Sequence, residues 1–322
     1  MLPRTVLLII LLLFALASLA SGLMLGSAQL SLGEVTGALL GNDTGLAQQV
    51  VWQLRLPRVA SAFACGGLLA MAGVLLQVLL RNPLADPYIL GISGGAAVGA
   101  LGAMLLGLSL AAVNGAALLG ALGAMGLVFA LSVRGGAWNM FRLLLTGVVL
   151  SAGFGAVISL MLSVAQTSEI KGMLFWLMGD LAHAGSPATA WGVMLGVAAV
   201  GLLLAGSLNV LSIGELKAKT LGVAVLPLQV MIFLAASAAT ATAVMQGGAI
   251  GFVGLLVPHL LRLMGVTDHR WLLPMSLLLG GSFLTFADTL ARTVAAPTQL
   301  PVGVLTALLG VPALLLLLSS KR

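Results

Sequence analysis

The sequence predicts an all-α polytopic membrane protein with about ten transmembrane helices. Hydrophobic residues make up 61% of the chain and charged residues only 7%, and the mean hydropathy is +1.20. A soluble globular domain usually has about 25% charged residues, so this class is excluded. The apolar residues also gather into runs of roughly 20, the length that an α-helix needs to cross about 30 Å of hydrocarbon.

We predict ten spans joined by polar segments. A cleavable signal peptide is the alternative at the first span, since Ala15-Leu16-Ala17 offers small residues, but the apolar run exceeds the roughly 7–15 residues of a signal core. Residues 26–54 are expected to form an external segment, and residues 167–187 an amphipathic segment at the outer surface. The predicted spans are residues 6–25, 59–80, 89–108, 112–133, 143–164, 191–208, 228–245, 250–263, 272–290 and 302–318.

The charge distribution predicts the orientation. Ten crossings place both termini on one side, and ten of the fourteen lysines and arginines fall on that side. By the positive-inside rule both termini are therefore expected to be cytoplasmic. The four basic residues expected on the outer side are Arg55, Arg58, Lys171 and Arg292.

Several functions are excluded by what the sequence contains. The formal charge of +6 comes from basic residues scattered singly between apolar runs, so it indicates topology and no nucleic-acid binding. The single cysteine, Cys65, lies inside an apolar run and excludes a disulfide framework or a cysteine-based metal site. No G-x-x-x-x-G-K-[ST] phosphate loop occurs, so the chain is not expected to hydrolyse ATP itself.

The most informative stretch is residues 81–100, between two apolar runs. Asn82-Pro83 and Asp86-Pro87 each place a short polar residue before proline, which favours a turn over a helix. The small residues at 91–97 then allow a new helix to pack closely against a neighbour. An ordinary polar loop between two membrane helices is the simpler interpretation.

The sequence of this stretch, NPLADPYILGISGGAA at 82–97, resembles the signature of the FecCD-type permeases. These are the membrane subunits of bacterial ABC importers for iron-siderophore complexes, haem and vitamin B12. The resemblance implies a vitamin B12 permease-like (type II ABC importer) architecture, with residues 1–322 as one transmembrane permease domain. Similar wording runs in family order at residues 53–58, 143–148, 174–179, 247–255, 257–259, 268–270 and 300–303.

The polar segment 211–223 is a candidate docking site for an ATPase. Ser212 and then Glu215 can start a short helix and Gly222 can end it, whereas a solvated loop is the alternative. In the resembled family this loop forms coupling helices that sit in a groove of the ATPase subunit, which binds ATP and Mg²⁺. The resemblance implies coupling roles for Ser212, Gly214, Glu215, Lys217, Lys219 and Gly222.

Three outer arginines are candidates for a second docking site. Arg55 and Arg58 are three residues apart on one helix face, and Arg292 lies at the outer end of the ninth span. Each could instead extend to the lipid head groups. In related permeases, arginines at these positions receive acidic residues of a periplasmic substrate-binding protein, a task that suits the bidentate guanidinium.

Two ionisable residues lie inside apolar runs. Asp288 precedes Arg292 by four residues, so we expect a local ion pair there. His259 follows Pro258 in an interrupted span and could be a haem ligand or proton relay, but a histidine satisfied by a backbone carbonyl is the more common case. The sequence therefore predicts no metal site and no cofactor bound by the chain itself.

The resemblance also implies a translocation path between the fifth and tenth spans of two subunits. Asn82 and Leu84, with Asn139 and Met140, match the family's cytoplasmic gates, although residues 138–141 depart from the small hydroxyl residues of some vitamin B12 permeases. The small, weakly polar residues of the fifth span could line the path or serve helix packing equally well. They are Ser151, Gly155, Ser159 and Ser163.

The predicted function is therefore an importer permease of the bacterial inner membrane. The expected partners are a second copy of the chain, two ATPase subunits and one periplasmic binding protein. The expected cargo is a ferric siderophore, haem or cobalamin. An ion-coupled secondary transporter is the alternative and would need buried ionisable groups, for which Asp288 and His259 are the candidates. A membrane enzyme lacks a catalytic cluster, because the chain has three histidines and one cysteine.

Overall fold

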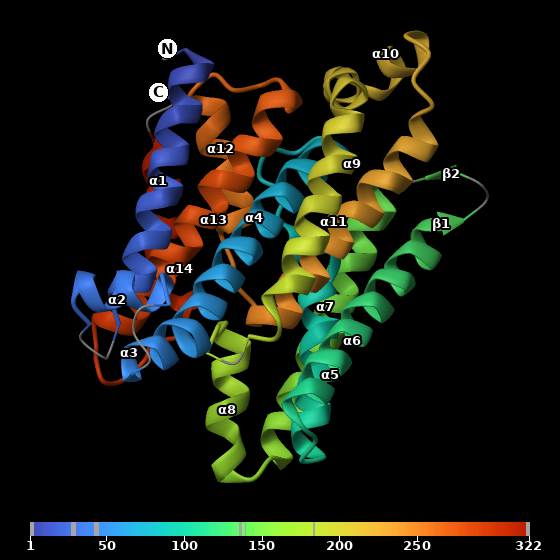
Figure 1. Ribbon diagram of the computed structural model, residues 1–322. Helices are drawn as coiled ribbons and strands as arrows, with labels where there is room; N and C mark the ends of the chain where they lie inside the picture. Colours follow the sequence, from blue (N-terminus) through green and yellow to red (C-terminus); the bar gives the residue numbers. More distant parts are fainter. Residues whose placement is uncertain are drawn as a thin grey trace.

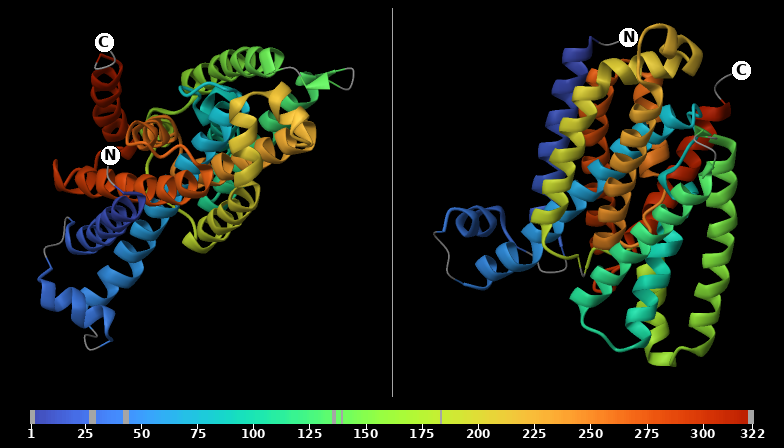
Figure 2. Two further views of the ribbon diagram at one scale, coloured as in Figure 1. Left: turned by 90° about the horizontal axis from the view of Figure 1, so that it is seen from above. Right: turned by 90° about the vertical axis from the view of Figure 1, so that its right-hand side faces the viewer.

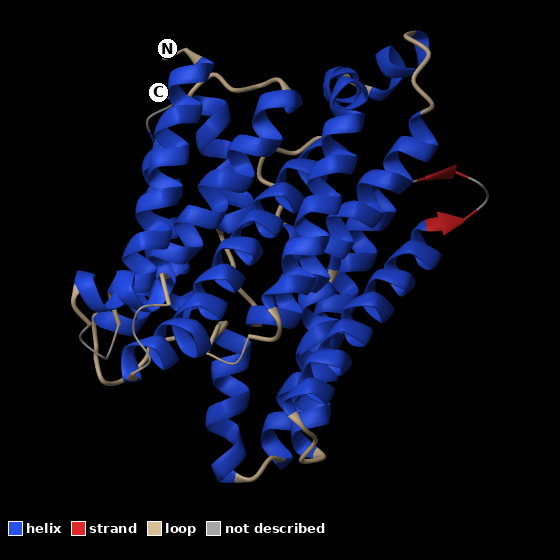
Figure 3. Cartoon of the chain, in the orientation of Figure 1, coloured by secondary structure: helices blue, strands red, loops and turns tan. Residues whose placement is uncertain are grey.

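The computed structural model of the 322-residue chain describes residues 3–26, 30–41, 45–134, 137–138, 140–182 and 184–319. They form a bundle of helices with one small strand pair, in which Val133 pairs with Trp138 (Figures 1 and 3). The elements are α1 (Arg4–Met24), α2 (Leu32–Leu39), α3 (Leu46–Gln49), the π-helix η1 (Val50–Arg55), α4 (Leu56–Leu79), the 3₁₀-helix η2 (Pro87–Leu90), α5 (Ile92–Leu105), α6 (Leu110–Ser132), β1 (Val133–Arg134), β2 (Ala137–Trp138), α7 (Met140–Val164), α8 (Thr167–Met178), α9 (Pro187–Ile213), α10 (Glu215–Thr220), α11 (Val225–Gly247), α12 (Val253–Leu263), α13 (His269–Thr293) and α14 (Val302–Ser319).

Each predicted span coincides with a helix. Within the described ranges, seven helical stretches are long and apolar enough to cross a membrane, and α5, α12 and α14 are shorter apolar helices. The N-terminus, the C-terminus and α10 lie at one end of the bundle, and α8 extends from the opposite end (Figure 1). We call the end that holds α10 the inner end and the opposite one the outer end.

The described residues of the external segment 26–54 form more helix than their polar sequence predicts. Ser31 and Glu34 form a capping box at the start of α2, since Ser31 Oγ accepts from the Glu34 N–H and Glu34 Oε2 accepts from the Ser31 N–H at 2.7 Å. Helix α3 and η1 then continue into α4 as one helical stretch over Leu46–Leu79. Arg55 therefore lies inside this long helix and not at the start of a span.

Helix α4 forms the centre of the bundle. In its membrane window 94% of the residues are buried. Glycines bring its backbone against two neighbours, because a Cβ on Gly66 would overlap the carbonyl of Gly280 in α13, and one on Gly73 would overlap the carbonyl of Gly254 in α12. These contacts pack α4, α12 and α13 backbone to backbone.

Two of the apolar helices are preceded by backbone that is not α-helical. Helices α5 and α12 have 14 and 11 residues, about 21 Å and 16 Å long at 1.5 Å per residue, so neither crosses about 30 Å of hydrocarbon alone. Residues 80–91 precede α5, where Asp86 Oδ1 accepts from the Tyr88 N–H at 2.8 Å and caps η2. Residues 248–252 precede α12.

One side chain joins the two breaks. Tyr88 Oη donates to the carbonyl of Ile250 at 3.0 Å and accepts from the Ile250 N–H at 2.9 Å. Irregular backbone at membrane depth is tolerated only where its polar groups find partners inside the protein. Tyr88, the one tyrosine of the chain, provides both partners for Ile250.

The margins of the bundle are packed less tightly. Only 11% of the membrane window of α7 is buried. In the view from above, α14 stands at the edge of the bundle (Figure 2). Both helices therefore leave apolar surface uncovered in the single chain.

Tyr88→Phe is expected to destabilise the fold by about 1–3 kcal/mol, because it leaves the N–H and C=O of Ile250 buried and unpaired. Thermal unfolding of the detergent-solubilised protein, followed by size-exclusion chromatography, measures the effect. The matched control is Phe286→Leu, a change at an exposed apolar residue of α13. Equal melting of Tyr88→Phe and the wild type would contradict this role for Tyr88.

Candidate functional site

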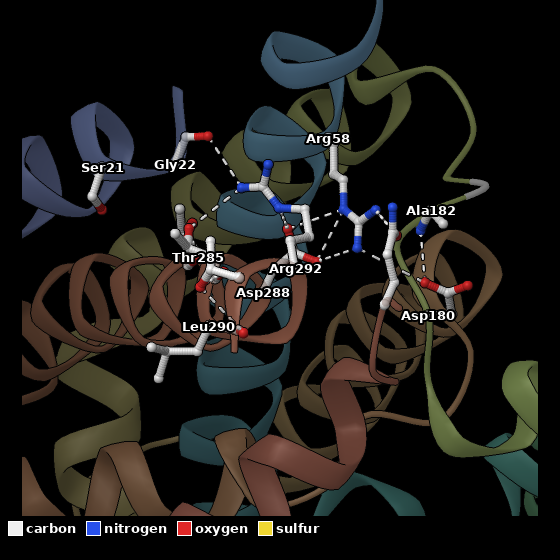
Figure 4. A network of polar contacts seen from close by, with 12 residues as sticks. Ser21, Gly22, Arg58, Asp180, Ala182, Thr285, Asp288, Leu290 and Arg292 are labelled. Atoms are coloured by element: carbon white, nitrogen blue, oxygen red, sulfur yellow. Dashed lines mark hydrogen bonds and ion pairs between the residues drawn. The ribbon is translucent and has the colours of Figure 1, made fainter. Parts of the chain in front are cut away.

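An ion cluster lies at the outer end of the bundle. Asp288 of α13 accepts from Arg58 of α4 in bidentate fashion, with Arg58 Nη2 at 2.8 Å and Nε at 3.1 Å from Oδ1 (Figure 4). Arg292 Nε lies 3.1 Å from Asp288 Oδ2. The side chains of Asp288, Arg292 and Arg58 are 1%, 7% and 11% exposed, so two cations share one buried carboxylate.

Backbone carbonyls at the end of α1 accept hydrogen bonds from two of the outer arginines. Arg55 Nη1 donates to the carbonyls of Leu23 at 2.6 Å and Met24 at 2.9 Å, and Arg292 Nη2 donates to the carbonyl of Gly22 at 3.1 Å. The last carbonyls of a helix lack intrahelical partners and carry partial negative charge, which favours cations. The arginines thus tie α1, α4 and α13 together.

The predicted Asp288–Arg292 pair is confirmed, and the structure adds Arg58 as a third member. All three outer arginines line a hollow of about 300 Å³ together with Gln299 and Ala182. Arg58 Nη1 also donates to Gln299 Oε1 at 2.8 Å. The three arginines therefore gather at one place on the outer end, and their docking role stays a prediction.

The inner end carries the short charged helix α10. It begins after Gly214, whose φ of 134° favours glycine, and Gly222 with φ of 79° follows its last turn. Glu215 Oε1 lies 3.0 Å from Lys219 Nζ, and its Oε2 lies 3.8 Å from Arg81 Nη2. No pattern in the sequence indicated the contact with Arg81, which brings the loop after α4 next to α10.

The prediction that Ser212 starts this helix was wrong. Helix α9 continues to Ile213, and Ser212 Oγ donates to the carbonyl of Asn209 at 2.7 Å within the last turn. A residue that caps the start of a helix has a non-helical backbone, whereas Ser212 is still helical because α9 continues past it. Gly214 takes the N-cap position instead and offers no side chain to cap with.

An amide connects α9 to α13 just before α10. Asn209 Nδ2 donates to Asp268 Oδ1 at 2.7 Å, and Asn209 Oδ1 accepts from the His269 N–H at 2.9 Å and lies 2.6 Å from His269 Nδ1. The hydrogen bond from Asn209 Nδ2, with one from the Arg270 N–H, holds the pKa of Asp268 below its ordinary value. Of these contacts, only the capping of α13 by Asp268 could be predicted from the sequence, because aspartate is a common N-cap residue.

The described gate residues lie in the turn between α4 and η2 and at the start of α7. Asn82 Oδ1 accepts from the Leu84 N–H at 2.9 Å, and Leu84 is 39% exposed. Met140 begins α7 and packs partly against the core. Asn139 lies outside the described residues.

The small residues of α7 lie on a helix that few other parts of the chain cover. The hydroxyls of Ser151, Ser159 and Ser163 each donate to a carbonyl of their own helix, those of Gly147, Gly155 and Leu160. A Cβ on Gly155 would meet no atom within 4 Å. Gly155, Ser159 and Ser163 are exposed and serve no close packing within one chain, whereas Ser151 is partly buried. That the stripe faces a second subunit stays a prediction.

The described residues contain no group of three or more histidine, cysteine, aspartate or glutamate side chains that could hold a metal ion. His259 is 5% exposed on α12, beside Pro258. Both residues lie inside a helix that is continuous from Val253 to Leu263.

The described part of the chain has the features of a membrane permease. It contains ten apolar helices, two of them preceded by a break in the α-helix, a charged helix at the inner end and an arginine hollow at the outer end. The chain matches the FecCD transport family over residues 7–320. It therefore belongs to this family of ABC importer permeases, and the resemblance noted in the sequence is confirmed.

Related proteins agree on the class. The hemin transport system permease of Yersinia pestis is 39% identical over 93% of this chain and 92% of its own. The cobalamin import system permease of Halobacterium salinarum is 44% identical over 86% of this chain and 75% of its own. The chain is thus a transport subunit of an ABC importer rather than an enzyme, and the comparisons give no support to an ion-coupled transporter.

The fold comparison points to the same class. A solved inward-facing structure described as a metal-chelate type ABC transporter aligns with a TM-score of 0.87 and 32% identity, covering 99% of this chain and 100% of its own. The predicted all-α architecture is therefore confirmed.

Asp288→Asn is expected to destabilise the protein by about 3–5 kcal/mol, because removing one partner leaves buried charge uncompensated. The measurement is the melting temperature of the purified protein in detergent. Glu169→Gln on α8 removes a carboxylate that is outside the ion cluster and serves as the control. Equal melting temperatures for Asp288→Asn and Glu169→Gln would show that the cluster contributes no stability.

Proposed function

We propose that this permease imports an organic metal chelate from the periplasm to the cytoplasm of a bacterium, driven by a separate ATPase that docks on α10. The observation that carries this proposal is the short charged helix at the end of the bundle that also holds both termini (Figure 1). The likeness of the chain to permeases named for hemin and cobalamin, and to a metal-chelate type transporter, supports the cargo class.

The charge distribution supports an orientation with α10 in the cytoplasm. Arg81 lies 3.8 Å from Glu215, and Arg4 lies near enough to Asp268 to lower its pKa. Basic residues far apart in sequence therefore lie at the same inner end. Arg55 and Arg58 lie at the opposite end with the outer arginine hollow. By the positive-inside rule the inner end faces the cytoplasm.

The assembled importer contains two copies of this chain, two ATPases that bind ATP and Mg²⁺, and one periplasmic binding protein. The uncovered faces of α7 and α14 support the pairing of two copies. Helix α14 and the end of α8 also line an apolar groove of about 530 Å³, which includes Met178 and Leu308. The translocation path runs between the subunits, with Ser151, Ser159 and Ser163 of α7 along it.

Reconstitution tests the proposal as a whole. Proteoliposomes that contain the permease, its ATPase and its binding protein should accumulate cyanocobalamin, hemin or a ferric siderophore only when ATP is enclosed. Accumulation by the permease alone under an ion gradient would reject the proposal.

Glu215→Gln is expected to uncouple the importer. The side chains of Glu215 and Lys219 are 34% and 60% exposed, so losing the pair should cost less than about 1 kcal/mol of stability. In proteoliposomes, uptake per ATP hydrolysed should fall at least fivefold while hydrolysis continues. Glu169→Gln at the outer end is the control, and wild-type uptake per ATP in Glu215→Gln would refute a coupling role.

Arg58→Gln is expected to weaken docking of the binding protein at least tenfold, equivalent to about 1.4 kcal/mol. Biolayer interferometry on nanodiscs measures the Kd, and raising the salt concentration should weaken wild-type docking. Arg142→Gln on α7 is the control. Because Arg58 also pairs with Asp288, each variant must first elute as a folded protein. An unchanged Kd in folded Arg58→Gln would exclude Arg58 from the docking site.

A further inference from the structure

A cavity lies at the outer end of the bundle, within one chain. It has a volume of about 860 Å³, which is in the range of small-molecule sites. Helix α8 forms one wall, and the adjoining ends of α5, α6 and α11 form the others. We call this cavity the outer pocket.

Gln246, one of the residues that line the outer pocket, carries a buried acceptor without a hydrogen-bond partner in the described part of the chain. Gln246 of α11 is 3% exposed, and its Nε2 donates to the Ser186 carbonyl at 2.9 Å and to Thr189 Oγ1 at 3.0 Å. A carbonyl can only accept, so these bonds fix the orientation of the amide. Gln246 Oε1 then has no hydrogen-bond partner among the described residues, and a ligand with an N–H or O–H donor would satisfy it.

A hydrogen-bond donor for the ligand lies on α8. Lys171 is exposed at the pocket, with its ammonium 6.0 Å from the ring centroid of Phe175, and can donate to a carboxylate or carbonyl. Phe175 and Trp176 provide flat apolar surface beside it. The outer pocket thus combines an unpaired acceptor, a cation and an aromatic wall.

The outer pocket adjoins the arginine hollow. Ala182 and Gln299 line both cavities, and Asp180 of the pocket lies 4.0 Å from Arg58 of the hollow. Cargo released by a protein docked on the arginines would therefore meet this pocket first.

We propose that the outer pocket receives the cargo before translocation, and that this cargo is an organic metal chelate with amide or hydroxyl donors at its surface. The inference rests on the proposed function, since it assumes an importer served by a binding protein. A small inorganic oxyanion would leave most of the 860 Å³ empty. A ferric porphyrin presents carboxylates at its edge but no amide or hydroxyl donor for Gln246. Corrinoids with amide side chains and hydroxamate siderophores offer both donors and acceptors.

Gly172 gives a selective way to block the outer pocket. It lines the pocket on α8, and a Cβ there would meet no atom within 4 Å, so Gly172→Phe should fill the pocket without disturbing the backbone. Gly196 of α9 is exposed, equally unobstructed and outside the pocket lining, so Gly196→Phe is the matched control.

The experiment measures binding by equilibrium dialysis with the full-length permease in nanodiscs. The probes are cyanocobalamin, a ferric trihydroxamate siderophore, hemin and molybdate. At least one of the first two should bind the wild type and Gly196→Phe equally. Gly172→Phe should bind it at least tenfold more weakly, and Lys171→Gln several-fold more weakly.

Several results would overturn the inference. These are equal chelate binding by Gly172→Phe and the wild type, binding of hemin or molybdate alone, and no binding of any probe. A phospholipid retained by the wild type and lost from Gly172→Phe, without chelate binding, would assign the pocket to lipid. Binding-protein affinity lost in Gly172→Phe without chelate binding would assign it to that protein.

Uptake by the reconstituted importer separates this inference from the proposed function. If the wild type takes up the chelate with ATP and Gly172→Phe does so at the same rate, only the outer pocket is rejected. If the wild type shows no ATP-driven uptake of any probe, the proposed function itself fails.

Discussion

The structure depends on one constraint of the bilayer, that backbone polar groups at membrane depth must find partners within the protein. The chain interrupts two crossings, before α5 and before α12, and one phenolic hydroxyl on Tyr88 serves both polar groups of Ile250. This contact helps to hold the two interruptions against each other. It also explains why a segment rich in turn residues can lie inside a bundle that is otherwise apolar.

The inner and outer ends are joined through the most closely packed helix, α4. Helices α4 and α13 meet backbone to backbone at Gly66 and Gly280, and the same two helices carry the outer ion cluster. At the inner end the loop after α4 contacts Glu215, and the start of α13 is bonded to Asn209.

The sequence was sufficient for features that depend on local pattern. In the described residues hydropathy located ten apolar helices, seven of them long enough to cross a membrane. The spacing of four residues between Asp288 and Arg292 predicted their pair. The capping box at Ser31 was also readable but was missed. The Arg58–Asp288 contact joins residues 230 positions apart, and Asn209 meets His269 only after both helices have packed. Such contacts follow from tertiary packing, which no local spacing encodes.

Because Asp288 already holds Arg58, an acidic side chain arriving from outside would substitute one carboxylate for another. The guanidinium would remain neutralised throughout, with Arg292 available to keep the displaced Asp288 paired. Such an exchange exposes no bare charge at any stage, so a partner could attach and leave without a high electrostatic barrier.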